Sequence, residues 1–389
     1  MAFNSLNPLA EALKIKDLII GWRREFHAYP ELGFEEFRTS QIVEENLRSW
    51  GYKVRRVGTG VIADLSGGDG LTIALRADMD ALPIQEENDV PYRSKVPGKM
   101  HACGHDAHVA MLLGAAKIIA EFSHILPNKV RLIFQPAEET VSGALRMVEG
   151  GAVDGVDFIF GIHVWADLPS GVIGLKEGAF LAGAGSFDIR IVGKGGHGAA
   201  PHEAIDPIPI AAQAILAFQT IVSRFLNPLE KGVVSVCSVK AGEAHNVIPN
   251  DVVMKGTYRF YSDSVAKLIE RKVDEILKGL TSAYGATYEL RMERTALPVI
   301  NDSKAISYVK KVAEALNVKT FEIPATMASE DFSEYLQRVP GAFIALGVKN
   351  ESKGIIYPHH HPKFNLDEDA LPIGTALEVG LVFHDYSSY

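Results

Sequence analysis

The sequence is poor in cysteine. Its 389 residues include only Cys103 and Cys237, which are too few for a disulfide framework and fit a reducing compartment. The N-terminal segment lacks a basic stretch followed by a sustained apolar one, so it does not resemble a secretory signal. We therefore expect a cytoplasmic protein.

Positive charge is also scarce. The formal net charge is -9 at pH 7, and no stripe or run of lysine and arginine stands out. Nucleic-acid binding would require such a basic footprint, and so would attraction to an anionic membrane surface. We therefore expect neither nucleic acid nor a membrane as a partner.

Long apolar runs are missing as well. No window reaches the ~18 uninterrupted apolar residues of a membrane span. The longest candidate, residues 208–222, is interrupted by Pro209, Gln213, Gln219 and Thr220. What the sequence does have is length. At roughly 100–200 residues per domain, it predicts two or three domains, with cores large enough to need no disulfide.

Strand and helix patterns alternate along the first part of the chain. The candidate strands are continuous apolar runs rather than alternating ones, namely VIADL at 61–65, LTIALR at 71–76, VRLIFQ at 129–134 and FIFGIHV at 158–164. Such runs are typical of central strands that are covered on both faces. The pattern predicts an α/β catalytic domain.

The pattern changes near residue 186. From there the order of elements is β-α-β-β-α-β, which is that of a ferredoxin-like unit, and α/β patterns resume afterwards. We therefore predict a discontinuous catalytic domain formed by residues 1–185 and 295–389. An inserted α+β domain at 186–294 would separate the two parts.

The strongest local signal for chemistry is HACGHDAH at 101–108. Cys103 and His105 lie two residues apart just before a helix pattern, so a thiolate and an imidazole could reach one metal ion. The alternative is a buried cysteine near ordinary histidines. The density of histidine, an uncommon residue, favours metal binding.

Three further signals follow candidate strands. They are Glu138 and Glu139 in QPAEET, His163 in GIHVW, and the histidine run 359–361 in YPHHHPKF. Taken alone, the glutamates could simply begin a helix, and a lone histidine is more often structural. Ligands of open α/β sheets gather beyond the carboxyl ends of strands, however, so these groups are expected to lie together.

Cys, Glu and three His donors exceed the needs of one closed tetrahedral zinc site. They suit two ions that share a ligand. A nucleophilic Cys103 is a weaker alternative, because it would leave the adjacent glutamates and the other histidines unexplained. A metal-binding chain without catalytic activity is a further alternative.

Longer segments carry a recognisable pattern. They are RRxFHxxPELGFEE at 23–36, ALRADMDALPI at 74–84, MHACGHDAHVAMLLGAA at 100–116, QPAEE at 135–139, GIHVW at 161–165, GKGGHGAAPH at 193–202, HNVIPN at 245–250 and SEDFSEY at 329–335. Together they resemble the M20 metallopeptidase family, and in particular its amidohydrolase branch of aminoacylases, hippurate hydrolases and auxin-conjugate hydrolases. The resemblance covers essentially the whole chain.

The resemblance implies a di-metal exopeptidase-type site that holds two zinc or manganese ions per chain. Its ligand positions match Cys103, His105, Glu139, His163 and His360. The run of three histidines leaves His359 and His361 as alternatives to His360.

Other positions are matched to roles around the metals. Glu138 matches the general base. Asp78 lies where the wider family has a His-x-Asp motif, here Arg76-Ala77-Asp78, and it is expected to orient a ligand histidine.

The resemblance also implies that the inserted domain is a lid and dimerisation domain, and it assigns roles to residues within it. His197 is expected to act in catalysis, often at the active site of the partner subunit, which implies a homodimer or a higher homo-oligomer. Asn246 and Arg259 are candidates for binding the carboxylate of the substrate, since arginine suits bidentate recognition. Arg259 could equally be a solvated strand residue.

The function expected from these residues is hydrolysis of the amide bond of N-acyl amino acids. A dipeptidase or carboxypeptidase, or a deacetylase of N-acetylated diamino acids, would use the same chemistry. The sequence does not separate these substrates, because they differ in the shape of the pocket.

Overall fold

The computed structural model describes residues 6–386, which form two compact units. Unit 1 contains the described residues up to Phe180, together with Ile300–Pro324 and the chain from Asp331 onward. Unit 2 contains Leu181–Val299 and Ala325–Glu330.

These units differ from the domains expected from sequence chiefly at residues 325–330, which belong to unit 2. Leu181 forms a parallel β-bridge with Thr326, and the N–H of Ala182 donates to the carbonyl of Ala328 at 2.9 Å. Contacts between segments so far apart in the chain leave no trace in the local sequence pattern.

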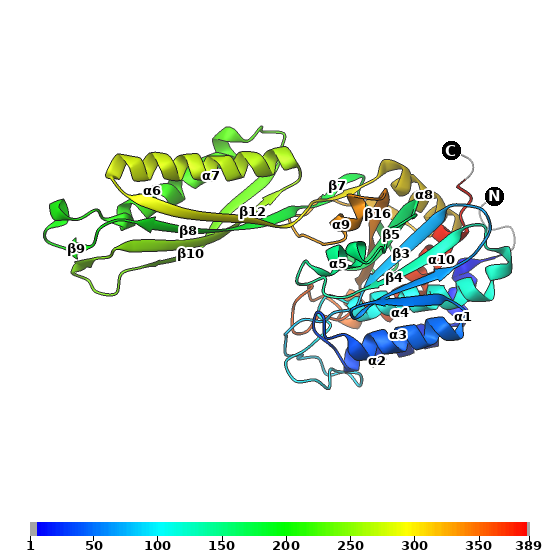
Figure 1. The fold of residues 1–389 in the computed structure, drawn as a ribbon. Helices are drawn as coiled ribbons and strands as arrows, with labels where there is room; N and C mark the ends of the chain where they lie inside the picture. Colours follow the sequence, from blue (N-terminus) through cyan, green and yellow to red (C-terminus); the bar gives the residue numbers. More distant parts are fainter. Residues whose placement is uncertain (1–5, 387–389) are drawn as a thin grey trace. The chain divides into compact units, whose positions relative to one another are not determined.

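Unit 1 is an eight-stranded sheet with helices packed against it (Figure 1). The strands, in the order in which they lie in the sheet, are β1 (Lys53–Val57), β2 (Gly60–Leu65), β4 (Lys129–Gln135), β3 (Thr72–Asp78), β5 (Phe158–Pro169), β16 (Gly341–Lys349), β6 (Ile173–Leu175) and β15 (Thr320–Glu322). The central strands β4, β3, β5 and β16 are parallel neighbours, so their carboxyl ends meet at one edge of the sheet.

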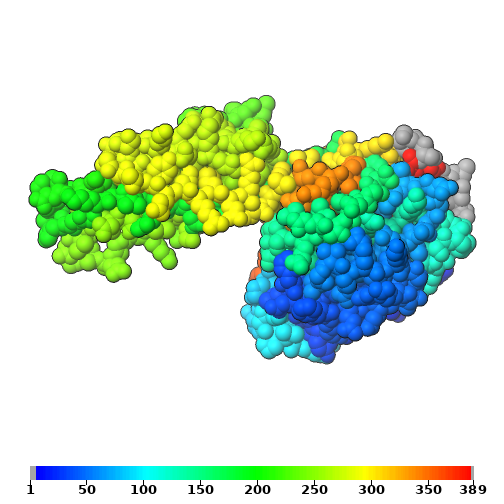
Figure 2. Space-filling model, viewed as in Figure 1, coloured from blue at the N-terminus to red at the C-terminus, as the bar shows by residue number. Residues whose placement is uncertain are grey.

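The helices of unit 1 are mostly amphipathic, but α4 and α10 are largely apolar and are buried along nearly their whole length. They are α1 (Pro8–Lys14), α2 (Lys16–Ala28), α3 (Phe37–Ser49), α4 (His105–Glu121), α5 (Gly143–Glu149), α8 (Ser303–Ala315), α9 (Ser333–Leu336) and α10 (Leu371–Phe383), with short 3-10 turns η1 (Ser123–Ile125), η4 (Glu351–Lys353) and η5 (Glu368–Ala370). Residues from the N-terminal part of the chain, blue in Figure 2, form much of the face that this view shows.

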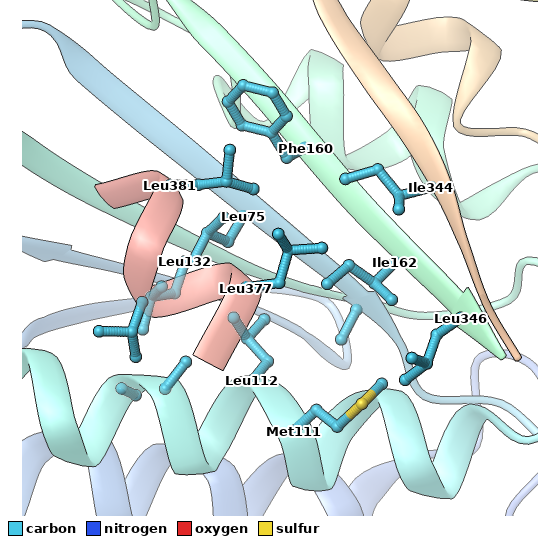
Figure 3. Close-up of a cluster of buried hydrophobic side chains, with 14 of the residues drawn as sticks. Leu75, Met111, Leu112, Leu132, Phe160, Ile162, Ile344, Leu346, Leu377 and Leu381 are labelled. Atoms are coloured by element: carbon cyan, nitrogen blue, oxygen red, sulfur yellow. The ribbon is translucent and has the colours of Figure 1, made fainter. Parts of the chain in front are cut away.

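The core of unit 1 lies between the sheet and the two apolar helices. Figure 3 shows Leu112 of α4 and Leu377 of α10 facing Leu75 and Ile162 of the central strands. All four side chains are essentially inaccessible to solvent. A helix that is hydrophobic on every side is buried, and this burial fixes the start of α4, where His105 lies.

Unit 2 has the expected β-α-β-β-α-β order. Its elements are β8 (Gly183–Val192), β9 (Gly196–His197), η2 (Pro201–Glu203), α6 (Pro207–Thr220) continuing into the π-helical turn η3 (Ile221–Phe225), β10 (Gly232–Ala241), β11 (Val247–Ile248), β12 (Asp251–Phe260), α7 (Asp263–Tyr284) and β13 (Thr287–Ala296). The main sheet has the antiparallel order β10-β12-β8-β13. Helices α6 and α7 cover one of its faces (Figure 1), which confirms the ferredoxin-like arrangement. Two short strands, β7 (Gly178–Leu181) and β14 (Val299–Asn301), pair where the chain passes between the units.

The helix over Pro207–Phe225 is long and apolar enough to cross a membrane by length and composition alone. In the fold, however, its Ile210, Ala214 and Phe218 are fully buried in the core of unit 2. The opposite face of the same helix is exposed and still apolar, with Leu216 71% accessible. It is therefore a surface helix of unit 2 with an uncovered apolar face.

Candidate metal centre

The candidate site lies at the carboxyl edge of the parallel strands in unit 1. Strands β3 and β4 end side by side, with Asp78 opposite Gln135. The loops that follow these strands carry Asp80 on one side and Glu138 with Glu139 on the other. Strand order therefore brings together segments that are far apart in the chain, as expected for an α/β sheet.

The bend between Cys103 and His105 requires glycine. Gly104 has a positive φ of 88°, and a Cβ at this position would lie 2.4 Å from the side chain of Val164. Because the chain turns here, Cys103 precedes helix α4 while His105 is its first residue.

His163 occupies a different position in its strand from the one expected. The sequence suggested the end of a strand, but β5 continues to Pro169. Its pairing with β3 stops at Gly161, whereas its pairing with β16 goes on. His163 therefore lies two residues beyond the last residue of β5 that pairs with β3, and the continuing pairing with β16 explains why β5 extends beyond His163.

The donor atoms gather into two groups that share Cys103. One group contains Cys103, His105 and His163, and the other contains Cys103, Glu139 and His360, with the ligand atoms of each group within 4.8 Å of one another. The Sγ of Cys103 lies 3.5 Å from Nε2 of His163. Two donor groups with a common member are the arrangement expected of two ions with a shared ligand.

Two buried polar atoms in this cluster lack a hydrogen-bond partner. Nε2 of His105 and Oε1 of Glu139 are both without one among the described residues, and they lie 4.0 Å apart. A buried unsatisfied polar atom is costly, so a cation between such atoms would satisfy both. The residues present therefore fit a metal site.

The second nitrogen of each buried donor histidine is fixed by a main-chain carbonyl. Nδ1–H of His105 donates to the carbonyl of Asp80 at 2.8 Å, and Nδ1–H of His163 donates to the carbonyl of Val164 at 2.6 Å. Each Nε2 therefore presents its lone pair to the cluster, in the way that a metal-binding histidine is usually oriented.

The electrostatics of the cluster also favour a cation. Burial raises the pKa of the Cys103 thiol and lowers the pKa of His163. The proximity of Cys103 and Glu139 raises the pKa of His360 to about 10. Burial alone would lower the pKa of His105, but Asp78, Asp80 and Cys103 together outweigh it and raise that pKa. The pKa values of His105 and His360 rise because the carboxylates of Asp78 and Glu139 lie beside them, and the same carboxylates would favour a bound cation.

The structure distinguishes the three consecutive histidines. Of the three, His360 is the one whose ring nitrogen joins a donor group, with Nε2 3.4 Å from Oε1 of Glu139. Nε2 of His359 instead accepts the N–H of Ala166 at 3.1 Å. His361 stacks on Tyr357, with ring centroids 4.6 Å apart. The left-handed backbone of His360, with φ of 64°, turns its side chain away from those of its neighbours.

Asp78 contacts two histidines and an arginine. Oδ1 accepts Nδ1–H of His108 at 2.5 Å, Oδ2 accepts from Arg76 at 2.5 Å, and Oδ2 lies 3.7 Å from Nε2 of His105. Burial opposes its ionisation, but Arg76 and the histidines outweigh this and hold the pKa of Asp78 well below its usual range. The sequence analysis missed His108, although its spacing of three from His105 places both on one helical face.

The three candidate residues of unit 2 are His197, Asn246 and Arg259, and they lie in two separate regions of this unit. His197 is exposed in β9 and pairs with Val247 of β11, and the N–H of Gly198 donates to the carbonyl of Asn246 at 2.8 Å. Arg259 lies near the opposite end of the unit's main sheet, opposite Ala184 of β8. The structure thus brings His197 and Asn246 together and keeps Arg259 apart from them.

Arg259 is a partly buried cation. Its guanidinium donates to the carbonyl of Tyr258 at 3.0 Å and to the hydroxyl of Thr257. No carboxylate of the described residues lies within ion-pair distance of it. Burial lowers the pKa of Arg259, and an anion from outside the chain would compensate this buried charge.

The two-group donor cluster on an α/β sheet and the ferredoxin-like unit define a class of metal-binding hydrolases. Within that class, the model of the family described as Peptidase family M20/M25/M40 matches residues 74–384. The chain therefore belongs to this family and is a hydrolase.

Relatives with assigned names are similar over most of the chain. Thermostable carboxypeptidase 1 of Saccharolobus solfataricus is 42% identical over 378 residues, covering 94% of this chain and 96% of the relative. N-acyl-L-amino acid amidohydrolase of Geobacillus stearothermophilus is 48% identical over 292 residues, covering 74% of this chain and 79% of the relative. Among solved structures, Bacillus subtilis YXEP, described as a dinuclear metal-binding peptidase of the M20 family, is 36% identical with a TM-score of 0.85, covering 95% of this chain and 98% of that chain.

Proposed function

We propose that this chain is a metal-dependent amidohydrolase that cleaves the amide bond of N-acyl amino acids. The observation that carries the proposal is the pair of donor groups sharing Cys103 at the carboxyl edge of the sheet. Its support comes from similarity to an N-acyl-L-amino acid amidohydrolase and to a protein described as a dinuclear metal-binding peptidase.

The proposed ligands of two divalent ions are Cys103, His105, Glu139, His163 and His360. A thiolate favours zinc, whereas carboxylate and imidazole accept manganese equally well, so we propose either metal. When bound, such ions supply a water of lowered pKa and polarise the substrate carbonyl. Asp78 is proposed to orient the histidine ligands through the contacts described above.

The proposed proton carrier is Glu138. Its carboxylate lies within 4.8 Å of the ligand atoms of His105 and Glu139, and its side chain is only 7% accessible. From this position it would accept the proton of the attacking water at a carboxylate oxygen. It would then return that proton to the nitrogen of the leaving amine, as general acid–base catalysis requires.

Arg259, Asn246 and His197 are proposed to act on the substrate. The unpaired, partly buried guanidinium of Arg259 suits the carboxylate of an amino acid. The exposed imidazole of His197 would donate a hydrogen bond to the oxyanion of the tetrahedral intermediate, and Asn246, held beside it by the β9–β11 pairing, would bind the substrate.

A homodimer formed through unit 2 is the proposed assembly. Strand β10 is at the edge of its sheet, where unpaired N–H and C=O groups are free to pair with another strand. The nearby helix over Pro207–Phe225 leaves Leu216 and Phe225 exposed. A second copy of the chain would cover this apolar face and extend the sheet across a two-fold axis. The cytoplasm remains the proposed location.

The second candidate function is that of a dipeptidase or carboxypeptidase. It is favoured by the 42% identity to a thermostable carboxypeptidase over 94% of this chain. Deacetylation of an N-acetylated diamino acid is a further variant with the same chemistry. All three reactions would use the same donor cluster and the same proton carrier, so substrate trials must separate them.

The test is a release assay on purified protein with its divalent metal content measured in parallel. The substrates are a panel of N-acetyl and N-benzoyl amino acids, dipeptides, and N-acetylated diamino acids. We expect the highest kcat/KM on an N-acyl amino acid and close to two ions per chain. Faster cleavage of dipeptides would replace the proposal with the peptidase function. No metal and no cleavage would overturn both.

A further inference from the structure

Asp80 joins the loop after β3 to the loop after β4. The N–H of Glu138 donates to Oδ1 of Asp80, and the N–H of Glu139 donates to Oδ2, each at 3.0 Å. The Asp80 side chain is 1% accessible. A single buried carboxylate therefore holds two consecutive amides, which carry the proposed base and a proposed ligand.

The loop held in this way has an unfavourable backbone. Ala137, just before the glutamate pair, has φ of 52°, and Val141, just after it, has φ of 53°. A residue with a Cβ rarely adopts this left-handed region unless surrounding contacts impose it. The N–H of Ala137 donates to Oε1 of buried Glu36 at 2.9 Å, so three consecutive amides are bound by two carboxylates.

The main chain of Asp80 has a separate contact. Its carbonyl accepts Nδ1–H of His105 at 2.8 Å, and Oδ1 of the same residue lies 3.4 Å from that nitrogen. The side chain of Asp80 thus binds the amides of Glu138 and Glu139 and also approaches His105, whereas the hydrogen bond that orients His105 comes from the backbone. A change of the side chain alone would disturb the glutamates and leave the backbone hydrogen bond to the histidine in place.

We propose that Asp80 is a positioning residue. By binding the backbone amides of Glu138 and Glu139, its two carboxylate oxygens set the directions in which these two side chains project from the loop. This inference rests on the proposed function of those two residues. A carboxylate is suited to this task because both of its oxygens accept hydrogen bonds. Asparagine would offer one oxygen and one NH₂ group, so one of the two amides would face a donor and lose its partner.

The test compares Asp80→Asn with wild type in two measurements. Metal affinity is measured by competition with a chelator for zinc, and kcat and KM are measured at saturating metal on the best substrate. We expect metal affinity to fall about 10–100-fold, as for other groups that orient a ligand. We also expect a drop in kcat that exceeds any rise in KM, because the base is misplaced.

Asp302→Asn is the matched control. Oδ1 of Asp302 accepts the N–H of Ala305 at 2.8 Å at the start of α8, a single bond that asparagine also makes. This variant should keep wild-type metal affinity and kcat. If Asp80→Asn does not fold, Asp80→Ser takes its place with the same expectations, because a serine hydroxyl is too short to serve both amides.

A double-mutant cycle separates positioning from general destabilisation. At saturating metal, Asp80→Asn should lower kcat strongly in wild type but only slightly in a Glu138→Gln background, where the base is already lost. An equal factor in both backgrounds would overturn the inference. So would unchanged metal affinity in Asp80→Asn, provided that wild type binds metal and is active. An inactive, metal-free wild type would instead reject the proposed function itself.

Discussion

Nε2 of His360 lies 3.4 Å from Oε1 of Glu139, whereas the two adjacent histidines point elsewhere. His360→Asn should therefore lower metal affinity by at least the 10–100-fold expected for weaker perturbations of a metal site. His361→Asn is the matched control and should bind metal like wild type, because His361 stacks on Tyr357 and accepts the N–H of Lys363, away from the donor groups. Zinc competition titrations on both variants would check this. An equal loss of metal affinity in the two variants would contradict the assignment of His360 as a ligand.

Glu138 and Glu139 should give opposite phenotypes when each is replaced by glutamine. Glu138→Gln removes the proton carrier but leaves the donor groups intact, so it should retain both metals while kcat falls about 10²–10⁴-fold. Glu139→Gln weakens one donor group and should lose metal. Metal analysis combined with steady-state kinetics on both variants is the measurement. If Glu138→Gln loses metal and Glu139→Gln retains it, Glu139 is the proton carrier and Glu138 the ligand.

His197 is predicted to complete the site of the partner subunit. A mixture of His197→Asn and Glu138→Gln chains, refolded or exchanged together, would then contain heterodimers with one intact site. With random pairing, about a quarter of wild-type activity should return, because half of the dimers would carry one working site of two. If His197 served its own chain, every site would lack one group and no activity would return.

The exposed apolar face of α6 should be needed for dimerisation. Leu216→Lys places a charge where the proposed interface buries a side chain that is 71% accessible in the single chain, so the variant should be monomeric. Leu13→Lys, at another exposed leucine, serves as the control and should not change the mass. Light scattering on both variants provides the measurement, and a dimeric Leu216→Lys protein would exclude this face.

Glu378 predicts a pH dependence of stability. This glutamate lies in α10, and its burial raises its pKa well above the usual value of 4.5. Below that value both folded and unfolded chains carry the proton. Above it the unfolded chain ionises first, so rising pH destabilises the fold with a slope of about 1.4 kcal/mol per pH unit from this group.

Glu378→Gln should therefore raise Tm at pH 7 and flatten its decline between pH 5 and neutrality. Glu314→Gln, on the exposed side of α8, is the control and should leave the profile unchanged. Thermal unfolding monitored by circular dichroism across this pH range is the measurement. A Glu378→Gln profile parallel to that of wild type would contradict the prediction.

Much of the fold could be predicted because its signals are local. The apolar runs of β3, β4 and β5 are continuous because both faces of the sheet are covered. The order of elements in unit 2 follows from alternating patterns whose periods change from strand to helix. Cys103 and His105 likewise lie only two positions apart in the sequence, so their proximity is visible without knowledge of the fold.

The contacts that depend on register could not be predicted. The bond between Asp80 and the amides of Glu138 and Glu139 requires β3 and β4 to be adjacent, parallel and aligned at their ends. The place of His163 within β5 depends on where the pairing of β5 with a different strand stops. Neither relationship can be inferred from the neighbouring residues in the sequence.

The two cysteines differ sharply in accessibility, since Cys103 is buried and Cys237 is exposed. Cys237 also lies at an irregularity in the pairing of β10 with β12, between Val236 and Ser238, on the edge strand. A maleimide fluorophore should consequently label the native protein at one thiol, without any engineered cysteine. That dye would report on the edge of unit 2, and its rate of attachment would slow wherever another strand covers β10.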